Sequence, residues 1–237
     1  MKKILLFIVF VLSLSMVSAE TILLDSVEPG SISTWSQYNS GYNPTPTFSE
    51  IISPYDLTTA IKIGVYGDTT GYCDQPNIYK IYDLGGIHNT DRTELKAYME
   101  FEYSGTYYNF PYVYVFLLDN NDNVLGQHIW YGKDVVGGLY QSYIASDPAS
   151  YTELPSDKGY FTLDLSEIGK NIEYRKIKVA LTGYTCEGTN SVVFDDLSLR
   201  KTYSDNDEPD EVPEFGVIAG AVALIGALGI FIIRRRH

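Results

Sequence analysis

Apolar and polar residues alternate with a period of two along much of the chain, as half-buried β-strands require. The alternation is clearest in four segments that are bounded by Gly, Asn, Asp or Pro: 61–66, 95–103, 161–165 and 176–181. A fifth segment, Val113 to Leu118, has apolar residues at both odd and even positions, so both faces of a strand there would be apolar. That pattern suits a central strand covered on both faces, or a strand that lines a second interface.

Turn chemistry favours antiparallel pairing of these strands. The segment Asp119 to Asn123 is rich in residues that tolerate positive φ, and it separates Val113–Leu118 from Val124-Leu125. Within residues 20–201, the longest amphipathic helical pattern, around residues 166–169, is shorter than about two turns. About eight strands without a long helix predict an all-β fold, an antiparallel β-sandwich over residues 20–201.

The N-terminal segment has the three parts of a secretory signal peptide. Lys2 and Lys3 precede an apolar run from Ile4 to Leu12, and Val17-Ser18-Ala19 supplies small residues for cleavage after Ala19. A retained anchor is the alternative, but the run is shorter than the roughly 20 residues that span a bilayer. We therefore expect residues 1–19 to be removed.

A second apolar segment, Phe215 to Ile233, contains 19 residues and no charge, which predicts a transmembrane helix. The arginines that follow it place the C-terminus in the cytoplasm, so residues 20–214 lie outside the cell. Residues 202–214 form a linker with five acids between Tyr203 and Glu211, too polar to fold on its own.

The C-terminal segment, residues 215–237, together with the tripeptide before the helix, resembles a known sorting signal. The parts that carry the resemblance are the tripeptide Pro213, Glu214 and Phe215, one apolar helix, and the terminal cluster Arg234, Arg235 and Arg236. They resemble the PEF-CTERM signal of archaeal surface proteins. The resemblance implies an archaeosortase-type processing enzyme that removes the helix and attaches the chain to lipid. A permanent membrane anchor is the alternative, and both place the domain on the extracellular face of the cell membrane.

Charge and cysteine content narrow the function further. The chain carries a net charge of -13, and the part between the two apolar segments carries -18, which excludes a nucleic-acid partner. Only two cysteines are present, Cys73 and Cys186. In an exported chain we expect them to form a disulfide, with two free thiols as the alternative.

The end of the sandwich carries a second resemblance. Residues 176–183 and 192–199, the latter with Phe194-Asp195-Asp196-Leu197, resemble the last two strands of jelly-roll carbohydrate-binding modules. The resemblance implies a jelly roll, often with a structural calcium ion bound by an aspartate of the last strand.

The alternation gives Asp195 an independent interpretation. Asp195 shares parity with Val193 and Leu197, so a regular strand would turn its carboxylate toward the core, where it needs a metal, a base or several donors. Asp25 or Glu28 would complete a structural Ca²⁺ site if the first and last strands are neighbours. A β-bulge that turns Asp195 outward is the alternative.

Catalytic signatures are missing from the sequence. GxSxG, HExxH and CxxC do not occur, and His88 and His128 are the histidines of the domain that remain as general bases. Glu100 and Glu102 share one strand face, as paired carboxylates of a glycoside hydrolase would, but they share it with Lys96 like an ordinary solvated strand.

Aromatic residues are the most informative excess, since the chain has 21 tyrosines. We expect exposed rings to contact a ligand, and the candidates are Trp35, Tyr107, Tyr108, Trp130 and Tyr131. Tyrosines that only cap the sandwich are the alternative. The sequence thus predicts a non-catalytic surface protein that binds carbohydrate, or mediates adhesion, in the archaeal envelope, with glycans or envelope proteins as partners. A purely structural envelope component and, less favoured, an exported glycoside hydrolase are the alternatives.

Overall fold

The computed structural model describes residues 19–38, 45–68, 76–104, 109–132, 150–185 and 187–202. Residues Ala19–Thr202 form one compact unit. Several predicted features lie outside the described residues: the signal peptide up to Ser18, both cysteines, Tyr107, Tyr108, and the linker and sorting segment from Tyr203 onward. In the ranges that the structure describes, no helix has the length and apolar character that crossing a membrane requires.

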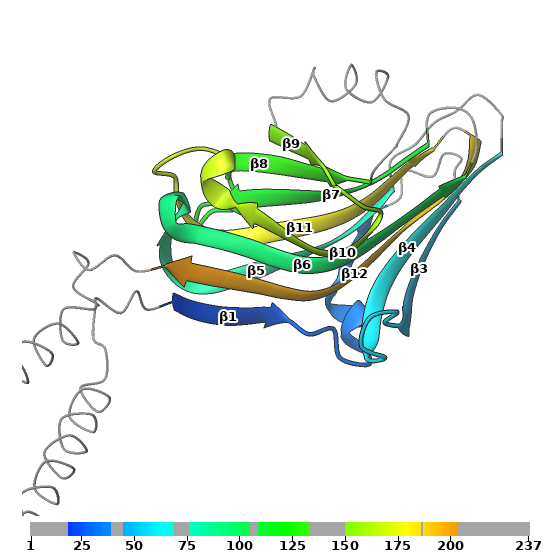
Figure 1. The fold of residues 1–237 in the computed structure, drawn as a ribbon, viewed down its shortest axis with the longest axis horizontal. Coiled ribbons are helices and arrows are strands. Elements are labelled where there is room, and N and C mark those ends of the chain that lie inside the picture. The colour runs from blue at the N-terminus through cyan, green and yellow to red at the C-terminus, as the bar shows by residue number, and fades with distance from the viewer. Residues whose placement is uncertain are drawn as a thin grey trace, which may run out of the picture. The chain divides into compact units, whose positions relative to one another are not determined.

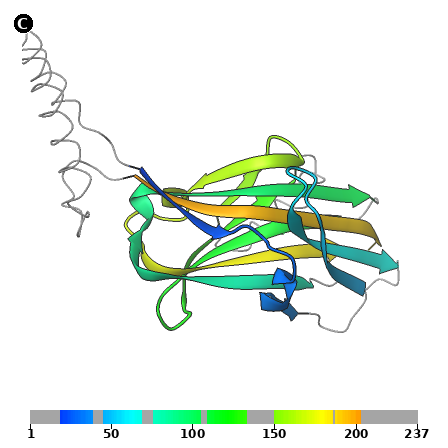
Figure 2. The same cartoon turned by 90° about the horizontal axis from the view of Figure 1, so that it is seen from below.

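Two β-sheets face each other (Figures 1 and 2). Sheet A has the order β10 (Lys158–Asp164), β6 (Thr93–Ser104), β12 (Glu187–Thr202), β4 (Thr59–Asp68) and β3 (Thr45–Ile52), with β1 (Ala19–Asp25) also paired to β12. Sheet B has the order β2 (Ser36–Tyr38), β5 (Asn77–Asn89), β11 (Glu173–Thr185), β7 (Asn109–Leu118), β8 (Val124–Tyr131) and β9 (Ser150–Glu153). Three short 3₁₀ helices connect strands: η1 (Ser31–Thr34), η2 (Thr90–Arg92) and η3 (Leu165–Glu167).

The predicted all-β, two-sheet architecture is confirmed. The pairs in both sheets are antiparallel except for β8 and β9, which run parallel. The predicted hairpin joins β7 to β8, where the Asp119 N–H donates to the Asn123 carbonyl over 3.0 Å and Asp122 adopts a φ of 63°. The alternating segments of the sequence became β4, β6, β10 and β11 because each has one apolar face to bury.

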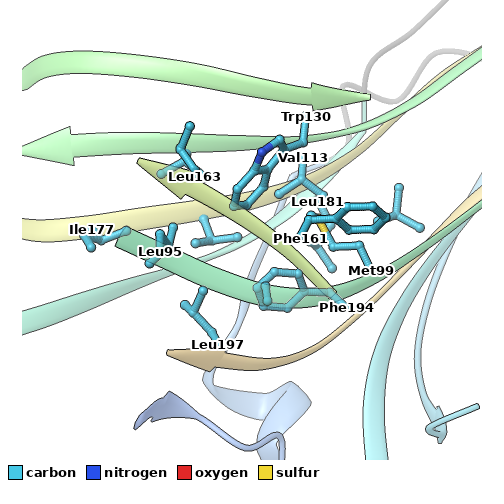
Figure 3. Packing of buried hydrophobic residues seen from close by; sticks show 14 of the residues in the cluster. Leu95, Met99, Val113, Trp130, Phe161, Leu163, Ile177, Leu181, Phe194 and Leu197 are labelled. Carbon is cyan, nitrogen blue, oxygen red and sulfur yellow. The ribbon is translucent and has the colours of Figure 1, made fainter. Parts of the chain in front are cut away.

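The core lies between the sheets and is built from these alternating positions. Apolar side chains from both sheets form one buried cluster (Figure 3). Ile61 and Ile63 enter it from β4, and Val113 and Val115 enter it from β7. Trp130 of β8 also lies inside (Figure 3), among the largest fully buried side chains.

Strand β12 contains a β-bulge where its neighbour changes. It pairs with β4 up to Phe194 and with β1 from Leu197, and its register with β6 shifts between Asp195 and Ser198. Asp196 has a φ of 53° at this point. Phe194 and Leu197 both lie in the core although they are three positions apart, so the bulge changes which positions of β12 face inward. Asp195, the residue after Phe194, lies on the outer face of the sheet. The bulge alternative for Asp195 is confirmed.

Gly183 of β11 lies where the two sheets approach closely. A Cβ atom added there would overlap Asn190 Oδ1 and Val65 Cγ2, which are both buried. We expect Gly183→Ala to lower the free energy of unfolding by about 1–3 kcal/mol through overpacking. Urea unfolding followed by circular dichroism measures the change. The matched control is Gly86→Ala in β5, where an added Cβ meets nothing within 4 Å; an equal loss in the two variants would contradict the prediction.

Candidate functional site

The outer face of sheet B carries a row of aromatic side chains along β7. Val113, Val115 and Leu117 point into the core, so the residues of opposite parity point outward. Those outward residues are Phe110, Tyr112, Tyr114 and Phe116. The outer face of an antiparallel sheet is commonly polar, so four aromatic residues in succession need an explanation other than packing between the sheets.

Rings from neighbouring strands extend this row. Tyr114 contacts Tyr112 at a centroid distance of 5.2 Å and Phe116 at 5.1 Å. Phe110 stacks on Tyr184 of β11 at 5.9 Å with an interplanar angle of 13°. The ring contacts hold these side chains in fixed orientations along the strand, which lowers the entropy that a ligand contact would otherwise cost.

Exposure changes along the row. Phe110 and Tyr112 are buried, whereas Tyr114 and Phe116 are partly exposed. On β5, Tyr79 is partly exposed and its neighbour Ile81 is 40% exposed. The accessible end of the aromatic face therefore lies over the middle of β5, β11 and β7.

Lys178 of β11 is the charged group of this accessible end. Its register partners are Ile81 on β5 and Phe116 on β7. Its Nζ lies 4.1 Å from the centroid of the Tyr79 ring and 5.2 Å from that of Phe116, within the range of cation–π contacts. We call Tyr79, Tyr114, Phe116 and Lys178 the sheet B platform. It combines apolar ring faces with phenol hydroxyls and an ammonium donor.

The structure places the predicted ligand-contact residues elsewhere. Trp35 and Trp130 are both buried in the core, Trp35 with its ring 5.9 Å from Phe194 in a T-shaped contact. The expectation that these two rings are exposed is wrong, because strand parity turns Trp130 inward beside Val113. Tyr131 lies with the outward aromatic cluster of sheet B, but it is buried too.

The predicted calcium ligands do not form one group. Asp25 accepts hydrogen bonds from Lys80 Nζ at 2.7 Å, from the Tyr82 hydroxyl at 2.8 Å and from the Val27 N–H at 2.9 Å. Glu28 is exposed and accepts from Ser26 Oγ. Among the residues that the structure describes, no three His, Cys, Asp or Glu side chains lie close enough to hold a metal ion.

Asp195 lies on the outer face of sheet A, opposite Tyr98 of β6. It is buried there, and its carboxylate accepts the Asp196 N–H at 2.8 Å. Burial raises the pKa of Asp195 to about 6, although a hydrogen bond from Ser53 opposes the shift. The carboxylate thus has hydrogen-bond donors from the protein itself.

The groups considered for catalysis are Glu100 and Glu102 on β6 and the two histidines, His88 and His128. Glu102 accepts hydrogen bonds from Ser191 Oγ at 3.0 Å and from Lys62 Nζ at 3.2 Å, which lower its pKa, whereas a glycosidase acid needs a raised one. Burial lowers the pKa of His128 to about 4 and also lowers that of His88. Both imidazoles are buried and lie away from Glu100 and Glu102, which are on the outer face of sheet A.

Comparison with known proteins finds solved structures with low sequence identity and low TM-scores to this chain. No family model matches the sequence, and no curated protein matches it. A family 11 carbohydrate-binding module of a Clostridium thermocellum cellulase matches with a TM-score of 0.43 and 10% identity, over 80% of this chain and 99% of that chain. A structure of carbohydrate-binding modules from the β-sandwich superfamily matches with a TM-score of 0.45 and 12% identity, over 77% of this chain and 62% of that chain.

A third similar structure is the enzymatically active domain of tailspike protein 4 from bacteriophage CBA120. It matches with a TM-score of 0.44 and 10% identity over 76% of this chain, which spans 22% of the length of that chain. Carbohydrate-binding modules are thus among the solved structures that are similar to this one. At identities and TM-scores this low, the likeness does not decide what this chain binds.

Proposed function

We propose that this protein is a non-catalytic carbohydrate-binding protein of the extracellular cell surface. The observation that carries the proposal is the sheet B platform, in which Tyr114, Phe116 and Tyr79 present ring faces around the Lys178 ammonium. Pyranose rings have apolar CH faces and many hydroxyls. They therefore fit a surface that offers aromatic faces together with hydrogen-bond donors.

The charge of the platform favours a neutral glycan or a weakly acidic one. Lys178 is the cation at its centre, while Asp83 lies two residues beyond Ile81 on the same face of β5. The chain as a whole carries a net charge of -13, which repels strongly anionic polymers at long range. Neutral β-linked or α-linked oligosaccharides are therefore the first class to test.

We propose further that the domain is exported through residues 1–19 and held at an archaeal cell surface by residues 215–237, with Pro213-Glu214-Phe215 as a signal for an archaeosortase-type enzyme. In the described structure β1 pairs with β12, and Glu20, the first residue after the expected cleavage site, lies opposite Lys201. The two ends of the sandwich that lead to these segments are therefore adjacent. A permanent transmembrane anchor gives the same location.

The proposal is tested with the full chain in detergent micelles on an array of neutral and acidic oligosaccharides, followed by calorimetric titration of each hit. We expect saturable binding, and we expect Phe116→Ala to weaken it at least about tenfold, since a central aromatic contact commonly carries more than 1.4 kcal/mol. The matched control is Tyr66→Ala, which removes a 57% exposed ring from β4 in sheet A.

Two results would count against this function. A folded chain that binds none of the oligosaccharides would favour a purely structural envelope component. Binding that Tyr66→Ala lowers as much as Phe116→Ala does would move the sugar site away from the sheet B platform.

A further inference from the structure

Lys178 is the lysine of the sheet B platform, and among the described residues no acid pairs with it. Lys62, Lys80 and Lys176 each contact a carboxylate, at 3.2, 2.7 and 2.7 Å. The contacts of Lys178 Nζ within the described part of the chain are those with two aromatic rings of the platform. The chain has 30 acidic and 17 basic residues, so a basic side chain without an acidic partner needs an explanation.

The Lys178 ammonium is accessible from outside. The residue is partly exposed, and its Nζ is not one of the buried polar atoms that lack a partner. The Tyr79 and Phe116 rings beside it are also partly exposed. At this register position the neighbouring strands contribute Ile81, Phe116 and Gln127, none of which is charged. A ligand that lies on the platform therefore meets the ammonium between the two rings.

The acids at this end of the outer face of sheet B are bound by other groups. Asp83 lies opposite Lys176 and accepts a backbone N–H of β5 at 2.9 Å. Asp122 accepts from Lys176 Nζ at 2.7 Å, and Asp119 accepts two backbone N–H groups of the β7–β8 turn at 2.7 and 2.9 Å. These three acids and two lysines leave the surroundings slightly negative. An anionic group is therefore attracted by direct contact with Lys178 and not by a positive field around it.

A sugar that covers the Tyr79 and Phe116 rings also removes water from the ammonium between them. A cation that loses its water without gaining an anion is costly, and the ring contacts offset that cost only in part. A hydroxyl group compensates weakly, whereas a carboxylate forms a charge-assisted hydrogen bond about twice as strong as a neutral one. The ligand that best satisfies Lys178 is thus a sugar that carries a carboxylate.

The ammonium suits an isolated negative charge. Lys178 is a point charge that neutralises one anion, and the net charge of -13 on the chain repels a polyanion. A phosphate ester carries about two charges at neutral pH and commonly uses several donors or a bidentate arginine. A uronic acid unit has one negative charge on C6 and keeps the apolar CH face of a pyranose for the rings.

We propose that the sheet B platform binds an oligosaccharide with one uronic acid unit among neutral sugars, and that Lys178 selects it by pairing with the carboxylate. This inference rests on the proposed carbohydrate-binding function and adds the specificity of the same site. The rings of Tyr79, Tyr114 and Phe116 contact the neutral faces of the sugar units. Lys178 decides which glycan is preferred, so its removal costs selectivity more than affinity for neutral sugars.

The test compares matched tetrasaccharides by calorimetric titration of the full chain in detergent micelles. Cellotetraose and maltotetraose are the neutral β-linked and α-linked forms; in the other forms, C6 of each glucose in turn carries a carboxylate, the methyl ester of that carboxylate, or a sulfate ester. We expect one carboxylate form to bind at least about tenfold tighter than its methyl ester, which lacks the charge. Raising NaCl from 50 to 500 mM should lower this preference several-fold.

Lys178→Met keeps most of the length of the side chain and removes the ammonium. We expect the preference for the carboxylate over the ester to fall below about twofold, with little change in the affinity for the ester. Lys178→Arg keeps the cation and should retain a preference of several-fold. The matched control is Lys96→Met in sheet A, which removes an ammonium 4.3 Å from the Tyr160 ring centroid and should leave the preference unchanged.

The inference is overturned if the carboxylate and its ester bind equally, if the preference survives Lys178→Met, if Lys96→Met abolishes it as well, or if the sulfate ester binds tighter than the carboxylate. Equal binding of the neutral and acidic forms that Phe116→Ala weakens would remove the selection of uronic acid and leave the carbohydrate-binding function standing. Lack of binding by every form would overturn both.

Discussion

Replacing Asp25 with alanine should lower the free energy of unfolding by about 2–4 kcal/mol, because it leaves a partly buried cation and a buried phenol without their partner. Asp25 is at the end of β1 in sheet A, whereas Lys80 and Tyr82 are both on β5 in sheet B. The carboxylate therefore joins the two sheets through hydrogen bonds of 2.7 and 2.8 Å. Guanidinium unfolding of the full chain at pH 7, followed by circular dichroism, measures the loss.

The matched control is Glu94→Ala, which removes a carboxylate from an exposed pair with Arg200 at 3.5 Å. Exposed ion pairs contribute about 0–1 kcal/mol, so this variant should unfold nearly like the parent chain. Adding Lys80→Met to Asp25→Ala should recover part of the lost stability, since it removes the unpaired cation. If Asp25→Ala costs no more than Glu94→Ala, the carboxylate does not tie the sheets together.

The period-two pattern was sufficient to predict strands, because burial of one face of a sheet needs nothing beyond alternation. It also indicated that Val113 to Leu118 is either a central strand covered on both faces or a strand that lines a second interface. The structure places β7 between β11 and β8, with the rings of Tyr114 and Phe116 on its outward face. The pattern did not show which residues of β12 face the core. The bulge after Asp195 reverses which positions face inward, and it depends on β12 changing its neighbour from β4 to β1.

The site was harder to predict than the fold because residue type does not reveal which face of a sheet a ring occupies. Trp130 was expected at a ligand since large aromatic residues often are, yet its parity matches that of the inward face of β8. Tyr79 and Lys178 come from strands that are about 100 residues apart in sequence. Their contact at 4.1 Å requires the pairing of β5 with β11, which alternation alone does not specify.

Trp130→Ala should be among the most destabilising single substitutions in the domain, with a loss of about 3–5 kcal/mol in the free energy of unfolding. The side chain is 1% exposed and lies in the core (Figure 3), so its removal leaves a cavity that the surrounding residues fill only in part. Guanidinium unfolding followed by circular dichroism measures the loss, and Tyr66→Ala, on an exposed ring, should change stability by less than about 1 kcal/mol.

Trp130→Phe separates the core role of this residue from a ligand contact. It keeps an apolar ring in the cavity, so we expect a smaller loss of stability than with alanine and a folded chain at 25 °C. Oligosaccharide affinity per folded molecule should then match that of the parent chain, because the indole reaches no ligand from inside the sandwich. Unchanged stability together with lost oligosaccharide binding would instead place Trp130 at the ligand, and sugar recognition would have to pass between the sheets rather than over the sheet B platform.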